Sequence, residues 1–136
     1  MKKLLFLCAL LGLALVSRAE DTVFIANPSV SDTLSADDAK NILLGNKTKW
    51  EVGGNIKLVV LADGPIHEKI IRDYTQRSVD QFDKYWKKLV FTGKGMAPAT
   101  AKTEAEVVDY VLKNPGAFGY VAKENAGDKV KVLPVK

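Results

Sequence analysis

The chain has 136 residues, of which 47% are hydrophobic and 26% are charged, and its formal net charge is +4. This composition is typical of a globular domain and excludes a disordered or fibrous chain. The excess of basic residues would point to a nucleic-acid partner, but Lys2, Lys3 and Arg18 all lie in the first few residues. The charge of the whole chain is therefore a poor guide to the partner of the folded part.

The start of the chain has the order of a secretory signal peptide. Lys2 and Lys3 precede an apolar run over residues 4–16, and small residues including Ala19 follow. This run is shorter than the roughly 20 residues that a membrane-spanning helix needs. We predict that residues 1–19 are cleaved off after Ala19 and that the product is periplasmic or secreted.

Cleavage at that point would leave residues 20–136 as the mature protein. The formal charge of this part is only +1, and Cys8, the single cysteine, is lost with the leader. The mature chain then has no disulfide. We expect one domain, which at this size buries about two-thirds of the surface of the unfolded chain.

Strand and helix patterns alternate along the mature chain. In its first half, we predict strands over 22–26 and 56–62, a turn at Asn27–Ser29, a helix capped by Ser35 that runs to about Leu44, and a loop over 46–55. In its second half, we predict helices over 66–76 and 79–91, a loop up to Thr103, a helix opened by a capping box of Thr103 and Glu106, and strands over 117–122 and 130–135. Strands separated by helices favour a layered α/β domain with a largely parallel sheet.

The side chains that carry most catalytic and metal chemistry are scarce. His67 is the only histidine, and we interpret it as a solvated or a helix-start histidine without a catalytic role. Without cysteine, a zinc site would need carboxylates for most of its ligands, so we predict no metal and no cofactor. No serine stands in a Gly-x-Ser-x-Gly nucleophile motif, and we expect no enzymatic activity.

A basic and aromatic run lies within the helix predicted over 79–91. Lys84, Lys87 and Lys88 surround Tyr85 and Trp86, an arrangement also found in nucleic-acid-binding surfaces. Acidic residues four positions before two of these lysines instead favour ion pairs on a solvated helix face. We therefore place the aromatic side chains against the core and predict no nucleic-acid partner.

The predicted helix starts offer one chemical possibility. The helices that begin near Ser35, Ile66 and Thr103 each present unpaired backbone N–H groups, which attract anions. Two such starts that meet at the carboxyl edge of the sheet would form an anion site. The turn over 63–67 is the best candidate, because it joins a buried strand directly to a helix. The alternative is that these are ordinary capped helix ends.

Four segments of the chain occur in the order found in phosphate-type periplasmic substrate-binding proteins of ABC transporters. They are Ile25–Ser29, Ile42–Gly45 with Lys47–Trp50, Phe91–Gly95, and Pro115–Val121. The chain resembles the short, single-lobe members of this family over nearly all of its mature length. The resemblance implies a single lobe of a class II periplasmic-binding-protein-like α/β fold, with a mostly parallel sheet flanked by helices.

The resemblance also implies an exported protein that binds a small anion, such as phosphate, for an ABC transport system. In the two-lobe members, backbone amides and hydroxyls at helix starts hold the ligand between the lobes. A lone lobe would then complete its cleft with a second copy of itself or with another protein lobe. The candidate ligand-binding residues stand at strand and helix ends: Asn27, Ser29, Ser35, Asp63, Gly64 and His67.

The turn after the second predicted strand departs from the family. Phosphate binders typically show an arginine and then a Gly-Ser-Gly-Thr-like turn, whereas this chain reads Leu-Ala-Asp-Gly-Pro-Ile-His over 61–67. The position of the arginine is apolar, and Pro65 has no N–H to offer an anion. The carboxylate of Asp63 remains as an acceptor for a protonated oxyanion.

A second hypothesis is a periplasmic protein–protein interaction module that keeps the scaffold without the ligand. The altered turn and the single lobe favour it, and an exposed apolar patch at the carboxyl edge of the sheet would support it. The partners predicted under the two hypotheses are a small anion, the membrane component of an ABC transporter, a second protein lobe, or a second copy in a homodimer.

Overall fold

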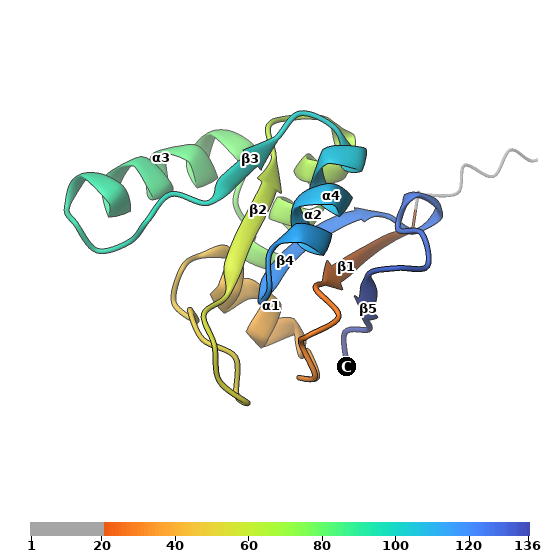
Figure 1. Cartoon of the computed structure of the whole chain (residues 1–136). Helices are drawn as coiled ribbons and strands as arrows, with labels where there is room; N and C mark the ends of the chain where they lie inside the picture. The colour runs from red at the N-terminus through yellow and green to blue at the C-terminus, as the bar shows by residue number, and fades with distance from the viewer. Residues whose placement is uncertain (1–20) are drawn as a thin grey trace, which may run out of the picture.

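The computed structural model describes residues 21–136, which form a five-stranded open sheet with helices packed on both faces (Figure 1). The strands are β1 (Thr22–Ala26), β2 (Lys57–Leu61), β3 (Ala99–Ala101), β4 (Ala117–Ala122) and β5 (Lys131–Leu133). The helices are α1 (Ala36–Leu43), α2 (Pro65–Thr75), α3 (Val79–Phe91) and α4 (Glu104–Lys113), with a short 3₁₀ helix η1 (Lys123–Asn125). The predicted signal peptide and its cleavage after Ala19 lie outside the described residues.

The strand order in the sheet is β3-β2-β4-β1-β5. β2 runs parallel to β3 and β4, and β1 runs antiparallel to both β4 and β5. Four strands therefore point the same way, which confirms the mostly parallel sheet, while β1 is inserted in the opposite direction. As a consequence, the residues that follow β1 and those that follow β2 lie at opposite ends of the strands: the former at the edge where β2 and β4 begin, the latter at the carboxyl edge of β2.

The helices and the other strands lie within about two residues of their predicted bounds, but the loop predicted between Phe91 and Thr103 contains β3. The prediction was wrong here because the Ala-Thr-Ala segment is short and carries little strand propensity. It becomes a strand by pairing with Val59–Leu61 of β2, which is a tertiary contact. β5 is also shorter than the predicted strand over 130–135.

Capping residues define the starts of α1 and α4. The Ser35 hydroxyl accepts from the Asp38 N–H at 3.0 Å, and the Asp38 carboxylate accepts from the Ser35 N–H at 3.1 Å, which closes a capping box. At α4, the Thr103 hydroxyl accepts from the Glu106 N–H as predicted. The Glu106 carboxylate, however, accepts from the Lys102 N–H at 2.8 Å, so the predicted capping box is only half formed.

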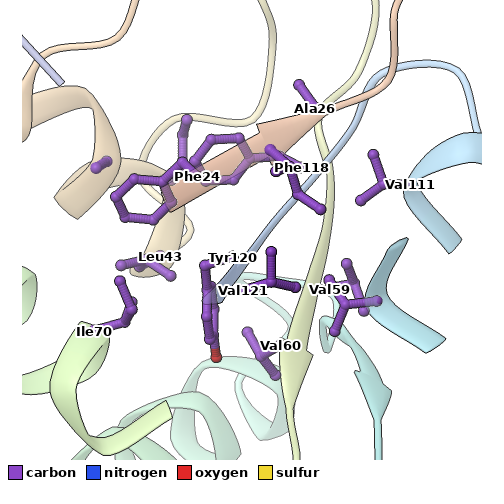
Figure 2. Close-up of a cluster of buried hydrophobic side chains, with 14 of the residues drawn as sticks. Phe24, Ala26, Leu43, Val59, Val60, Ile70, Val111, Phe118, Tyr120 and Val121 are labelled. Atoms are coloured by element: carbon purple, nitrogen blue, oxygen red, sulfur yellow. The ribbon is translucent and has the colours of Figure 1, made fainter. Parts of the chain in front are cut away.

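The core lies on both sides of β4, all of whose residues are buried. On one face, Phe24 stacks on Phe118 with ring centroids 5.1 Å apart and meets the ring of Tyr74 on α2 edge-on (Figure 2). On the other face, a Cβ at Gly119 would lie 2.9 Å from the Val107 side chain of α4. The absence of a side chain at Gly119 therefore lets α4 pack directly on the sheet.

α3 projects from the body of the molecule (Figure 1). Two of its aromatic side chains attach it to the end of α1. The Tyr85 hydroxyl donates to the Leu44 carbonyl at 2.6 Å, and the Trp86 indole N–H donates to the Leu43 carbonyl at 2.9 Å. The lysines of this helix are exposed, and Lys84 pairs with an aspartate one turn earlier at 3.2 Å. This confirms the prediction of a solvated basic face with inward aromatic residues.

Within residues 21–136, none of the helices combines the length and the apolar composition that crossing a lipid bilayer requires.

The turn between α4 and β4 depends on Gly116, whose φ is +82°. Its carbonyl accepts from the Trp50 indole at 3.0 Å and from the Lys57 N–H at 3.1 Å. A Cβ at this position would collide with the backbone carbonyl oxygen of Asn55. The neighbouring atom is backbone, so it cannot move aside as a flexible side chain would.

We predict that Gly116→Ala lowers the free energy of unfolding by about 3 kcal/mol, because it combines a left-handed backbone with a steric collision. The matched control is Gly127→Ala, where φ is +74° and no atom lies within 4 Å of the added Cβ. We expect this control to lose about 1 kcal/mol of unfolding free energy, because only the left-handed backbone conformation disfavours alanine there. Urea unfolding measures both values, and equal losses in the two variants would contradict the steric argument.

Candidate functional site

The residues predicted to bind a ligand lie in two groups and do not form one site. Asn27 and Ser29 follow β1 at the edge where β2 and β4 begin, and Ser35 starts α1 beside that edge (Figure 1). Asp63 and Gly64 follow β2 at the opposite, carboxyl edge, and the candidate histidine lies two residues into α2. The reversed direction of β1 causes this separation.

The polar atoms of the first group are already engaged within the fold. The Asn27 amide donates to the carbonyls of Val111 and Leu112 at 2.9 and 3.2 Å, and its oxygen accepts from the Ser29 N–H at 2.9 Å. Asn27 is buried, and it ties the end of α4 to the turn after β1. Ser35 is occupied by the capping of α1. These contacts give the three residues a structural role.

His67 lies in the first turn of α2 and is buried, with 2% of its surface exposed, so the helix-start alternative is correct and the solvated one is wrong. Its ring stacks on Tyr120 and meets Phe82 edge-on. The periodicity of α2 points this position toward the sheet, and the imidazole finds a polar partner there. His67 Nδ1 lies 2.6 Å from the Tyr120 hydroxyl.

The Tyr120 hydroxyl joins β2, β4 and α2 through two hydrogen bonds. Its oxygen accepts from the Leu61 N–H at 3.1 Å, beyond the part of β2 that pairs with β4. The hydroxyl proton can then be donated to Nδ1 of a neutral His67, which carries its own proton on Nε2. Burial raises the pKa of Tyr120, which keeps the hydroxyl proton in place.

Burial also lowers the pKa of His67 below its ordinary value of 6.5. Asp83, Asp63 and Glu68 act in the opposite direction, but burial is the larger effect. Protonation would convert Nδ1 into a donor that faces the hydroxyl proton of Tyr120. The neutral imidazole is therefore the form that the fold accommodates.

The carboxyl edge of β2 and β3 brings together the starts of α2 and α4. The two strand ends are aligned by a hydrogen bond from the Ala62 N–H to the Ala101 carbonyl at 2.8 Å. Asp63 and Gly64 follow β2, and Lys102 and Thr103 follow β3. The predicted meeting of two helix starts at this edge is confirmed for α2 and α4, but not for α1.

The two helix starts differ in how their N–H groups are used. α4 is capped by Thr103, whereas no side chain caps α2, which follows Gly64 at φ +103°. First-turn N–H groups have no partner inside a helix, so those of α2 are available to a ligand. Asp63 is exposed beside them. Among the described residues, no three His, Cys, Asp or Glu side chains are grouped as a metal site requires.

Lys102 was not among the predicted site residues. It is exposed and places a positive charge at the same edge as Asp63. Sequence reasoning missed it because β3 was taken as a loop, so nothing aligned Lys102 with the end of β2. A short Ala-Thr-Ala segment just before a helix cap is the only signal that would have identified it.

We predict that the stability of the protein falls as the pH drops below about 6.5. The unfolded chain takes up a proton at its histidine near that pH, whereas the folded chain does so only at lower pH. The contribution of neutral His67 to the free energy of unfolding is therefore fully present above pH 6.5. It is lost as the pH falls from 6.5 to the lower pKa of His67 in the folded state. Urea unfolding between pH 7.5 and 5.5 measures this dependence.

The control for this prediction is His67→Gln, which keeps a hydrogen-bond acceptor for Tyr120 but does not titrate. Its stability should be nearly constant over the same pH range, since His67 is the only histidine of the chain. A variant with the same pH dependence as the natural protein would show that another group is responsible.

No protein-family model matches the chain, and a search of curated proteins finds no match. Among solved structures, PstS from Borrelia burgdorferi is similar with a TM-score of 0.64 at 16% identity, over 85% of this chain and 47% of that one. An ABC-type phosphate transport receptor from Vibrio cholerae has a TM-score of 0.59 at 12% identity, over 85% of this chain and 46% of the receptor. A phosphate ABC transporter substrate-binding protein from Clostridium perfringens, solved with bound phosphate, has a TM-score of 0.64 at 18% identity. The match covers 85% of this chain and 44% of that one.

These likenesses concern the fold, because identities this low do not transfer a function. The chain spans about half the length of each of these neighbours. Its five-stranded open sheet flanked by helices matches a single lobe of the phosphate-type periplasmic binding proteins, as the sequence resemblance implied.

Proposed function

We propose that this protein is a solute-binding lobe that holds a small oxyanion, with phosphate as the first choice, at the carboxyl edge of β2 and β3. The observation that carries the proposal is the uncapped start of α2, which joins β2 directly at this edge. The fold likeness to phosphate-binding proteins supports the same class of ligand.

The backbone supplies the main attraction for an anion. An α-helix carries a partial positive charge at its N-terminus, and its first N–H groups point out along the axis. α2 has eleven residues, so its dipole is fully developed. Pro65 contributes no N–H, which leaves those of Ile66 and His67 as the donors of the first turn.

Asp63 and Lys102 would select which anion is bound. The Asp63 carboxylate repels a fully ionised oxyanion but accepts a hydrogen bond from one that still carries a proton. Hydrogen phosphate carries such a proton near neutral pH and sulfate does not. Lys102 supplies a positive charge that offsets the repulsion. This pair would replace the arginine and hydroxyl groups that phosphate-type proteins typically have at this turn.

Asp63 and Lys102 are exposed at the proposed site, and the chain spans about half the length of each structural neighbour. We propose that a second lobe, from another copy of this chain or from a different protein, covers the carboxyl edge when the anion is bound. The proposal includes export after cleavage at Ala19, delivery of the anion to the membrane component of an ABC transporter, and no enzymatic step.

We predict that phosphate raises the melting temperature of the protein and that sulfate does not. Ligand at a hundredfold excess over Kd stabilises a folded protein by about 2.7 kcal/mol. For a domain of this size, this corresponds to a shift of roughly 10 °C. Differential scanning fluorimetry with phosphate, sulfate, nitrate and acetate measures the shift, and analytical ultracentrifugation of the same samples reports any second copy.

Two variants test the assignment of the site. Asp63→Asn removes the acceptor and should abolish the preference for phosphate over sulfate. Asp128→Asn, an exposed aspartate in the turn after η1, removes the same charge elsewhere and should leave the preference unchanged. A protein that no anion stabilises, or a phosphate shift that Asp63→Asn does not alter, would rule out this site.

The alternative function, an interaction module, is favoured by a separate observation. The most exposed large apolar residues are Phe91 and Met96, with 91% and 89% of their surfaces exposed. They lie at the end of α3 and in the loop after it, not at the carboxyl edge where such a patch was anticipated. This surface is distinct from the proposed anion site.

A further inference from the structure

A groove of about 660 Å³ lies between the end of α1, the first half of β2 and the loop that follows α3. This volume is within the range of sites that bind ligands or side chains. Six of its apolar lining residues come from four separate segments of the chain: Ile56, Leu58, Trp86, Met96, Pro98 and Tyr110. The groove is thus formed by tertiary structure, at the end of β2 opposite to the proposed anion site.

Close packing at two glycines shapes the wall of the groove around Trp86. A Cβ at Gly45 would lie 2.8 Å from the Trp86 ring, and a Cβ at Gly95 would lie 2.9 Å from Leu89. The Trp86 indole N–H is held by the Leu43 carbonyl at 2.9 Å. The wall is therefore fixed in position, so a partner does not have to order it on binding.

The groove borders a part of β2 that has a strand neighbour on one side only. β3 pairs with Val59–Leu61, whereas Lys57 and Leu58 pair with β4. The Lys57 N–H donates to the Gly116 carbonyl on the β4 side, and backbone groups alternate in direction along a strand, so only Leu58 directs backbone groups toward the other side. The groove therefore offers a partner mainly side-chain contacts.

The charge of the groove has one sign. Lys47, Lys57 and Lys94 line it, and no aspartate or glutamate does. Lys47 is neutralised by Asp38 at 3.3 Å and by a glutamate at 3.5 Å. Lys57 and Lys94 are exposed and form no ion pair within residues 21–136. Two unneutralised lysines beside an apolar channel favour a partner that carries carboxylates.

Met96 is the second observation that points to a partner, because it lines the groove while 89% of its surface is exposed. Phe91, five residues earlier, is 91% exposed. Large exposed apolar side chains mark surfaces that proteins bind. Methionine is flexible and adapts to the side chain that it covers.

We propose that this groove binds an extended, acidic segment of a partner protein. The segment would lie in the groove beside Leu58, with an apolar side chain against Trp86 and Met96. Its carboxylates would pair with Lys57 and Lys94. A second copy of this chain does not fit, because its own edge strands, β3 and β5, read Ala-Thr-Ala and Lys-Val-Leu and carry no carboxylate.

The test is selection of random eight-residue peptides, displayed on phage, against the purified protein, followed by fluorescence anisotropy with the enriched peptides. We expect enrichment of peptides that combine Asp or Glu with apolar residues. The double variant Lys57→Glu/Lys94→Glu should weaken their binding about tenfold or more. The matched control Lys84→Glu/Lys87→Glu changes the same number of charges on the solvated face of α3 and should leave binding unchanged.

Four results would overturn the proposal. Three of them are the absence of any enriched peptide, enriched peptides without carboxylates, and equal binding by the Lys57→Glu/Lys94→Glu variant and the natural protein. Self-association that Met96→Glu abolishes would overturn it in favour of a second copy as the occupant. The phosphate shift, measured on the same variants, should be unaffected, so failure of this proposal is distinguishable from failure of the anion site.

Discussion

The antiparallel insertion of β1 between β4 and β5 determines which parts of this protein meet. Because β1 runs against β4, the turn after it lies at the edge where β2 and β4 begin, far from the turn after β2. Asn27 and Gly116 build a junction at that edge, and Asp63 and Lys102 lie at the other. One strand direction thus divides the polar residues of the chain into a structural set and a set available to a ligand.

The proposed anion site depends on the core through the hydroxyl of Tyr120. β2 and β4 pair only at Lys57 and Leu58, and further along the hydroxyl takes the place of a backbone acceptor for Leu61. The same hydroxyl holds His67, two residues into α2. The end of β2 and the start of α2 are therefore fixed relative to each other by one buried side chain, which is the requirement for a preorganised N-terminus.

The two proposed binding surfaces lie at opposite ends of β2. The carboxyl end carries the uncapped helix start, and the first half borders the basic groove. The residues assigned to the two surfaces do not overlap, so a substitution at one leaves the contacts of the other in place. Under the two proposals, one surface would face a second lobe and the other a separate partner.

The sequence by itself determined the helices and most strands, because caps such as Ser35, helical periodicity and continuous apolar runs are local signals. It also indicated the mostly parallel lobe and the turn at Asp63. Tertiary structure decided the direction of β1, the existence of β3, the burial of His67 and the exposure of Met96. These depend on partners distant in the chain: β3 forms only beside β2, and His67 is buried because Tyr120 offers it a hydrogen bond. The local sequence does not reveal such pairings, because the stability of each of these residues in its conformation depends on residues that are close in space but distant in the chain.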